Sequence, residues 1–276
     1  MKIKNILVPL DFSPCSKNAL RQAAILAHLW NARLHLLHAT HIPSPHIYMG
    51  EPIPEIVYTN YEKEIKNVLQ SLEQDVPLLK SVEYETMELV SSLIEAINTA
   101  IFTKSIDLIV MGSRGSHNMI EKFLGSNATD VIRSVSLPVL IVPSHITSLS
   151  INKIGLALEP GTFHDTAKLD YVAKLADLND AKIEVFFVGK NGEFVDFNRS
   201  DYNAYFEIHF KGLEYEYFSI ENNHTVNGIM NFAKEHQLDL LVMIPHNHNL
   251  TERVLKGSIT KQVADKVNIP LLSIHD

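Results

Sequence analysis

Residues 5–11 read Asn-Ile-Leu-Val-Pro-Leu-Asp, and the pattern returns at residues 153–159 as Lys-Ile-Gly-Leu-Ala-Leu-Glu. Residues 107–111 (Asp-Leu-Ile-Val-Met) return in the same way at residues 239–243 as Asp-Leu-Leu-Val-Met. The matching segments keep their order, and one gap of about 17 residues explains why the offset falls from 148 to 132. Because self-similarity in a fixed order is typical of repeated units, the sequence predicts a tandem duplication.

The length of the chain fits two repeated domains. At about 150 residues per domain, 276 residues give two, and the polar stretch at 144–150 (Ser-His-Ile-Thr-Ser-Leu-Ser) is the expected join. We therefore predict domains at residues 1–144 and 151–276. Hydrophobic residues make up 46% and charged residues 20%, which excludes a disordered or collagen-like chain.

Short apolar runs alternate with helical patterns along the first domain. The expected strands are Ile3–Leu10, Leu34–Ala39, Val82–Leu89, Leu108–Met111 and Val139–Val142. The expected helices run from a Ser13-Pro14 cap to about Trp30, and over Tyr58–Asp75, Leu93–Thr103 and Ser126–Val135, with a proline-rich loop at 41–57. Strands that alternate with helices form βαβ units, so the fold class is α/β, with a parallel sheet and helices on both faces.

Three residues stand at the expected carboxyl ends of strands, namely Asp11, Ala39 and Gly112. In an open parallel sheet, ligands bind beyond these ends, at the point where the strand order reverses. The fold therefore predicts one crevice near these residues before any motif is considered.

A glycine-rich loop follows the fourth expected strand. Residues 111–115 read Met-Gly-Ser-Arg-Gly and residues 125–127 read Gly-Ser-Asn, which gives the spacing Gly-x2-Gly-x9-Gly-Ser. Glycines permit close approach of the backbone, successive amides can surround an anion, and the start of a helix favours phosphate. Arg114 can add a cation, and Asp11 can accept hydrogen bonds from ribose hydroxyls. The loop thus predicts a nucleotide site, and the alternative is that its glycines only form turns.

The start that ends in Asp11, the Leu-Leu-His-Ala run that ends at Ala39 and the glycine spacing resemble the universal stress protein family. The resemblance covers nearly the whole chain and is stronger for residues 1–143 than for residues 151–276. It implies two tandem, open, twisted five-stranded sandwiches of the adenine nucleotide alpha hydrolase-like kind. These would pack as an internal pseudo-dimer through their last strands, and a homodimer is a further possibility.

The resemblance also implies ATP, together with Mg²⁺, in the first domain, because the ATP-binding branch of the family carries this glycine spacing. Adenine would lie near Asp11 and the backbone of Ala39, and the phosphates near residues 115 and 125–127. The candidate nucleotide-binding residues are Pro9, Asp11, Ala39, Met111, Gly112, Arg114, Gly115, Gly125, Ser126 and Asn127.

The second domain has lost most of this motif. At the offset of 132, residues 244–247 read Ile-Pro-His-Asn where residues 112–115 read Gly-Ser-Arg-Gly, and Pro245 also removes an amide. Glu159 replaces Asp11, and only the Gly-Ser pair at 257–258 remains. We therefore predict that the second domain is a structural partner; the alternatives are a different ligand or retained nucleotide binding.

The chain has 14 histidines but one cysteine, Cys15, which excludes an intramolecular disulfide and a cysteine-based zinc site. His246 and His248 are the candidate metal ligands, with His224 or Glu252 to complete a site. We expect instead that the histidines lie in loops and at sheet edges, and that no metal is bound. Cys15 is expected to be a small residue in a first helical turn, a reactive thiol being the alternative.

Two further details carry expectations. His35 and His38 stand three apart on one expected strand and should therefore point to opposite faces of the sheet. Ser91-Ser92 stands where many universal stress proteins have Gly-Xaa-Pro, so the turn after the third strand should differ from theirs.

The formal charge is −8 and no basic stripe is visible, so neither nucleic acid nor an anionic membrane is an expected partner. No leader or spanning segment is recognisable, and the expected location is the cytoplasm. The loop lacks the Gly-x4-Gly-Lys-[Ser/Thr] pattern, so ATP turnover should be slow or absent, and we assign no catalytic residue. We predict an ATP-binding regulatory protein of the stress response; a slow ATP hydrolase and a scaffold with a relic site remain alternatives.

Overall fold

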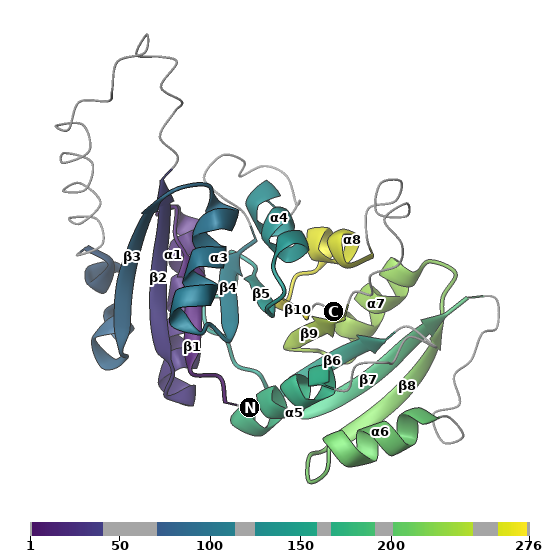
Figure 1. Cartoon of the computed structure of the whole chain (residues 1–276). Coiled ribbons are helices and arrows are strands. Elements are labelled where there is room, and N and C mark those ends of the chain that lie inside the picture. Colours follow the sequence, from purple (N-terminus) through teal and green to yellow (C-terminus); the bar gives the residue numbers. More distant parts are fainter. Residues whose placement is uncertain are drawn as a thin grey trace, which may run out of the picture.

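The strands in the described part of the chain form one continuous ten-stranded sheet, in the order β3-β2-β1-β4-β5-β10-β9-β6-β7-β8 (Figure 1). The computed structural model describes residues 2–40, 71–113, 125–158, 167–190, 201–244 and 259–274. The strands are β1 (Asn5–Pro9), β2 (Arg33–Thr40), β3 (Tyr84–Val90), β4 (Leu108–Gly112), β5 (Val139–Val142), β6 (Lys153–Leu158), β7 (Lys182–Gly189), β8 (Tyr215–Glu221), β9 (Leu240–Met243) and β10 (Leu271–Ser273).

Helices connect the strands. They are α1 (Pro14–Trp30), α3 (Leu93–Lys104), α4 (Ser126–Ser134), α5 (Ala167–Asn179), α6 (Asp201–His209), α7 (Thr225–Glu235) and α8 (Ile259–Lys266), with a 3₁₀ helix η2 (Pro77–Ser81). The expected elements of the first half are confirmed to within two residues wherever they are described. The expected loop at 41–57 and most of the helix at 58–75 lie outside the described residues, although residues 71–75 are helical.

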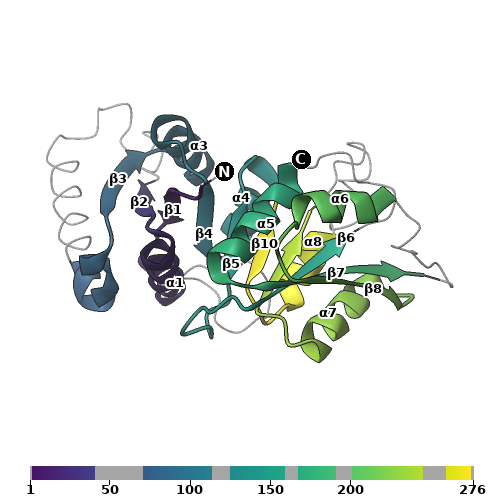
Figure 2. The ribbon, with the colours of Figure 1, turned by 90° about the horizontal axis from the view of Figure 1, so that it is seen from below.

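The two halves meet through their last strands. Every strand pair within a half is parallel, whereas β5 and β10 pair antiparallel, with Leu140 opposite Leu272. The expected internal pseudo-dimer is therefore present, and its two five-stranded sheets are joined into one. Within the first half, α1 and α3 lie on opposite faces of the sheet (Figure 2).

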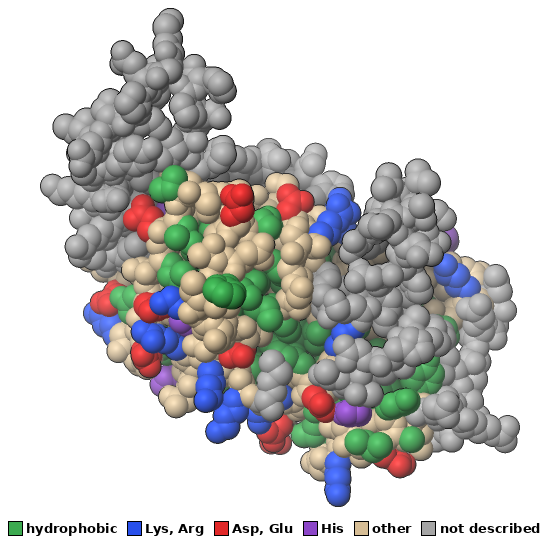
Figure 3. Space-filling model, viewed as in Figure 1, with side chains coloured by type: hydrophobic (Ala, Val, Ile, Leu, Met, Phe, Trp, Pro, Cys, Tyr) green, Lys and Arg blue, Asp and Glu red, His purple; other side chains and the backbone are tan. Residues whose placement is uncertain are grey.

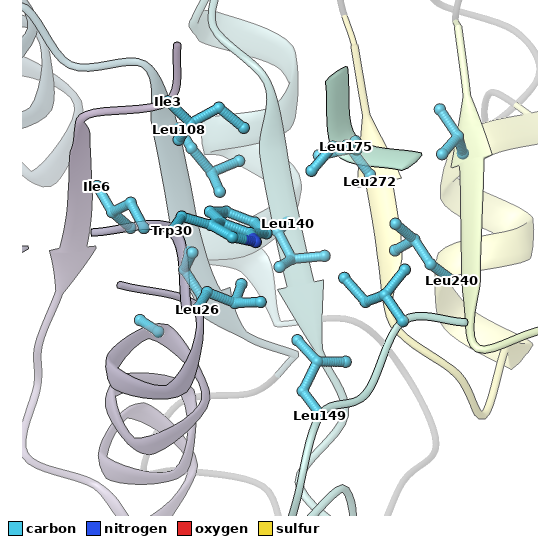
Figure 4. Packing of buried hydrophobic residues seen from close by; sticks show 14 of the residues in the cluster. Ile3, Ile6, Leu26, Trp30, Leu108, Leu140, Leu149, Leu175, Leu240 and Leu272 are labelled. Carbon is cyan, nitrogen blue, oxygen red and sulfur yellow. The ribbon is translucent and has the colours of Figure 1, made fainter. Parts of the chain in front are cut away.

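The hydrophobic core consists of two clusters, one on each face of the sheet. Successive residues of β1 alternate between them, because Ile6 and Val8 belong to one cluster and Leu7 belongs to the other. Both clusters contain residues from both halves. In Figure 4, Trp30 and Leu140 of the first half lie toward Leu272 of the second. The junction is therefore built like the interior of a single domain.

Backbone details repeat between the halves. Asp107 Oδ2 accepts hydrogen bonds from the two successive amides that lead into β1 (2.7 and 2.9 Å), and Asp239 Oδ2 does the same at β6 (2.8 and 3.0 Å). Asn31 and Asp180, which end α1 and α5 at an offset of 149, both have left-handed φ angles, 52° and 51°. The duplication predicted from the sequence thus extends to capping and turn geometry.

The polar segment between the halves is held by α1. The Asn18 side-chain amide donates to the carbonyl of Ile146 (3.0 Å). The Gln22 side chain donates to the carbonyl of Thr147 (3.2 Å) and accepts from the amide of Leu149 (2.8 Å). Gln22 is completely buried. Because unpaired buried polar groups are costly, these bonds fix the connection against the first half.

A polar cluster around the buried His35 joins β1, β2, β3 and α3. His35 is only 2% exposed. Its Nδ1 lies 2.9 Å from Glu85 Oε1 and its Nε2 lies 3.0 Å from Asn5 Oδ1, while Lys104 Nζ lies 2.6 Å from Glu85 Oε1. Burial lowers the pKa of His35, against the opposing effect of the Glu85 carboxylate. The expectation of loop and edge histidines is therefore wrong for His35, which lies on an inner strand.

The second half carries a matching cluster with different charges. Glu184 stands at the position equivalent to His35, and its carboxylate lies 2.7 Å from His236 Nδ1 and 3.5 Å from Lys153 Nζ. His236 is equivalent to Lys104 at the offset of 132. A buried acid thus replaces a buried imidazole at the same place in the sheet.

Candidate functional site

The strand order reverses between β1 and β4. From β1 the chain moves outward to β2 and β3, and it then returns to place β4 on the other side of β1. The crevice predicted for a doubly wound sheet therefore lies at the carboxyl ends of these two strands. Asp11 follows β1 there, and Gly112 ends β4.

The loop after β1 is a tight, hydrogen-bonded turn. Asp11 Oδ1 accepts from the amide of Ser13 (3.0 Å), and Ser13 Oγ accepts from the amide of Ser16 (3.2 Å) and so caps α1. Between them Phe12 has a φ of 59°, a left-handed conformation that is costly for a residue with a side chain. The turn leaves Asp11 exposed at the mouth of the crevice.

Hydrogen bonds within the turn stabilise the ionised form of the Asp11 carboxyl group. Its burial against the turn would raise its pKa, but hydrogen bonds from Ser13 and Ser16 favour the charged form and lower the pKa below its ordinary value of 3.8. A carboxylate has about four lone-pair positions, so Asp11 can still accept further hydrogen bonds from a ligand.

The end of β2 is tied to the same turn. The Leu10 amide donates to the carbonyl of Leu37 (2.7 Å), and the Leu10 carbonyl lies 2.7 Å from His38 Nδ1. The rings of His38 and Phe12 pack with their centroids 4.7 Å apart. Ala39, half-buried, follows His38 at the same edge of the sheet. These contacts could not be predicted from the sequence, since nothing in the spacing of His38 and Leu10 indicates that they meet.

Gly112 is required by a close contact within the protein. A β-carbon at this position would lie 2.6 Å from Cys15 Sγ and 2.8 Å from the Cys15 carbonyl oxygen. The first turn of α1 therefore packs directly on the end of β4. The expectation for Cys15, a small residue in a first helical turn, agrees with its buried position. The absence of a side chain at Gly112 therefore lets the end of β4 and the start of α1 touch.

The two parts of the glycine motif, residues 112–115 and 125–127, are joined by a backbone hydrogen bond. The Ser113 amide donates to the carbonyl of Val142 (3.1 Å), and the Gly125 amide donates to the carbonyl of Ser113 (2.7 Å). Gly125 is the N-cap of α4, and Ser126 and Asn127 in its first turn are exposed. The helix start therefore stands beside the end of β4, as the motif predicts.

The start of α4 differs from those of α1 and α3. Ser13 caps α1, and Ser92 caps α3 in a reciprocal box with Glu95, whereas Gly125 provides no side-chain cap. The first-turn amides of α4 are thus not capped by a side chain of the cap residue and can receive an anion. The turn after the third strand, where many universal stress proteins have Gly-Xaa-Pro, is here the start of α3. It is formed by the reciprocal capping hydrogen bonds of Ser92 and Glu95.

The other candidate residues are placed as follows. Pro9 is the last residue of β1 and pairs with Leu37, and the side chain of Met111 is buried in the core, so each can offer only its backbone to a ligand. Arg114 and Gly115 lie outside the described residues. Their proposed role remains a prediction.

The second half has no equivalent of the Gly112 contact at the matched position. Ile244 stands there and is buried, 8% exposed. Residues 245–258, which include His246, His248 and Glu252, lie outside the described residues, as does Glu159. Within the described ranges, no three His, Cys, Asp or Glu side chains are grouped so that they could hold a metal ion.

The surface charge offers no general attraction for an anion on the face shown in Figure 3, where acidic and basic side chains are interspersed. On this face, an anion would depend on local amides and individual cations rather than on a general positive surface charge. Among the helices in the described part of the chain, none is long and apolar enough to cross a membrane.

Two copies of a doubly wound sheet with the order 3-2-1-4-5, joined through their fifth strands, define a tandem α/β protein of the adenine nucleotide alpha hydrolase-like class. The model of the universal stress protein family matches residues 2–143 and 207–275, and the chain belongs to that family.

The chain is similar along its whole length to some universal stress proteins and over about half of its length to others. It is 23% identical over 293 residues to a universal stress protein of Synechocystis sp., covering 99% of this chain and 100% of that protein. It is 32% identical over 146 residues to universal stress protein A homolog 1 of Coxiella burnetii, covering 51% of this chain and 97% of that protein. A crystal structure of a universal stress protein from Archaeoglobus fulgidus has the same fold, with a TM-score of 0.75 at 18% identity, covering 99% of this chain and 97% of that chain.

Proposed function

We propose that the chain is an ATP-binding regulatory protein, with one nucleotide site in the first half at the carboxyl ends of β1 and β4. The domains would be residues 1–144, which bind the nucleotide, and residues 151–276, which serve as a structural partner. In this proposal the candidate residues form three parts. Asp11 and Ala39 lie at the nucleoside end, the start of α4 lies at the phosphates, and Gly112 lies between these two ends of the site.

The observation that carries the proposal is the glycine-capped start of α4. An ATP triphosphate needs several hydrogen-bond donors, and the first-turn amides of a helix supply them together with the favourable end of its dipole. The hydrogen bond from the Gly125 amide to the Ser113 carbonyl, which joins this helix start to the end of β4, supports the proposal. The ionised Asp11 carboxylate is suited to accept from ribose hydroxyls.

A magnesium ion would arrive with the triphosphate and be held mainly by phosphate oxygens and water, as is usual for Mg²⁺. The residues that we place at the site bind and orient the nucleotide. None of them is assigned as a base that activates water, so the proposed output is a change of conformation or partner rather than turnover.

The test uses the same substitution at matched positions in the two halves. Gly125→Val would crowd the proposed phosphate site, and Gly257→Val changes the equivalent position 132 residues later. Binding of Mg-ATP is measured by calorimetry and by the shift of the unfolding transition, where saturation at about 100 times the Kd adds about 2.7 kcal/mol. We expect wild type and Gly257→Val to bind and Gly125→Val to lose binding.

Two outcomes would overturn the proposal. The first is absence of binding in wild-type protein that releases no nucleotide on denaturation, which would favour a scaffold with a relic site. The second is equal affinity in wild type and Gly125→Val. Release of phosphate that requires Mg²⁺ and is lost in Gly125→Val would instead identify a slow hydrolase.

A further inference from the structure

His38 is the side chain that connects the end of β2 to the turn carrying Asp11. Its Nδ1 lies 2.7 Å from the Leu10 carbonyl oxygen, and its ring packs on Phe12. A carbonyl oxygen can only accept, so His38 Nδ1 carries the hydrogen and donates it. The acceptor belongs to the peptide group between Leu10 and Asp11, so the bond fixes the orientation of the peptide plane from which Asp11 begins.

The residue after Asp11 is held in an unfavourable conformation. Phe12 has a φ of 59°, which costs a residue with a side chain about 1–2 kcal/mol. Such a conformation persists only where the surroundings hold it. The contact between the His38 and Phe12 rings lies within the range in which aromatic rings attract each other. His38 thus contacts the turn on both sides of Asp11, through a hydrogen bond before it and ring packing after it.

From these contacts we infer that His38 is a positioning residue: its Nδ1–H holds the Leu10–Ser13 turn in the conformation that presents the Asp11 carboxylate to the nucleotide. The inference rests on the proposed function. It gives β2 a second role in the site, because β2 then contributes His38 as well as Ala39. The nucleoside end is then set by β2 and β1 together, whereas the phosphate end is set by β4 and α4.

Two substitutions separate the donor from the ring. In His38→Asn, the side-chain nitrogen stands the same two bonds from Cβ as Nδ1 does in histidine, so the donor is kept and the ring is lost. In His38→Phe, the ring is kept and the donor is lost. Since a hydrogen bond contributes about 0.5–1.5 kcal/mol net, we expect His38→Phe to bind Mg-ATP about 2- to 13-fold more weakly than wild type. His38→Asn should stay closer to wild type than His38→Phe, because its amide restores the bond and only the ring contact with Phe12 is lost.

A double-mutant cycle with Asp11→Asn shows whether His38 acts through Asp11. If it does, His38→Phe should weaken binding in the wild-type background and have little further effect in Asp11→Asn, because the group being positioned is already altered. A purely structural role would reduce affinity by the same factor in both backgrounds. Urea unfolding of every variant accounts for changes in overall stability.

The outcomes are distinct. Full affinity of His38→Phe, equal weakening by His38→Phe and His38→Asn, or an equal effect in the Asp11→Asn background would each overturn the positioning role while leaving ATP binding intact. Failure of the wild-type protein to bind Mg-ATP would overturn the proposed function, and the inference with it.

Discussion

Replacing Gly112 by alanine tests the close contact between the start of α1 and the end of β4. The new β-carbon would lie 2.6 Å from Cys15 Sγ and 2.8 Å from the Cys15 carbonyl oxygen, where ordinary contacts are 3.4–4 Å. The thiol can relieve its contact only by rotating within a buried site, and the carbonyl belongs to the first turn of α1, so neither contact opens without cost. β4 is held by β1 and β5 on its two sides, so the helix start must move by several tenths of an ångström.

Overpacking of this kind typically costs about 1–3 kcal/mol. Urea unfolding should show the loss as a lower midpoint at unchanged slope. The thermal midpoint should fall by about 2–4 °C for each kcal/mol, the value for domains of about 150–250 residues. The matched background is Cys15→Ala, which removes the shorter of the two contacts and leaves the carbonyl. Gly112→Ala should therefore cost about 1 kcal/mol less in that background than in wild type.

The reasoning is refuted if Gly112→Ala leaves both midpoints unchanged, since the contact would then relax at no cost. It is refuted equally if the substitution costs the same with and without the Cys15 thiol, because Sγ is the nearest atom to the new methyl group.

Three further substitutions have defined outcomes. Asp11→Asn removes a carboxyl group whose pKa is lowered by folding, so its contribution to stability is present above pH 3.8 and lost as the pH falls below it; unfolding at pH 7 should show a small destabilisation that disappears in acid. Gln22→Met should cost about 1–3 kcal/mol in urea, because the amide of Leu149 loses its buried acceptor while side-chain volume is kept. Ser92→Ala should cost about 1 kcal/mol through loss of the capping box, whereas the neighbouring Ser91→Ala should change the midpoint little.

Much of the fold can be predicted from local signals. The Ser-Pro pair at 13–14 marks the start of α1, and the structure begins the helix at Pro14 with Ser13 as its cap. Gly125 likewise marks the start of α4. The tandem repeat itself predicts that the two halves share one strand order, since each copy must follow the same path. A helix cap can be recognised from adjacent residues, and a duplication can be recognised from equivalent segments of the two halves. Neither prediction needs knowledge of contacts between distant residues.

The contacts that shape the candidate site could not be predicted in this way. Gly112 suggests a turn or a ligand in the sequence, yet its partner in the structure is Cys15, far away along the chain. The hydrogen bond from His38 to Leu10 depends on the register of β1 against β2, which no local pattern specifies. The same holds for Gln22, whose polarity on a buried helix face is explained only by the connecting segment that it binds.

The antiparallel pairing of β5 with β10 within one chain affects how the two sides of this interface can change in evolution. In a dimer of identical subunits, every change in the gene appears on both sides of the axis at once. Here the two sides are encoded separately within one chain, so a substitution can be tolerated on one side while the other keeps its ancestral chemistry. The buried His35 on one side and Glu184 on the other illustrate this freedom, because no symmetric assembly could hold both at the same position.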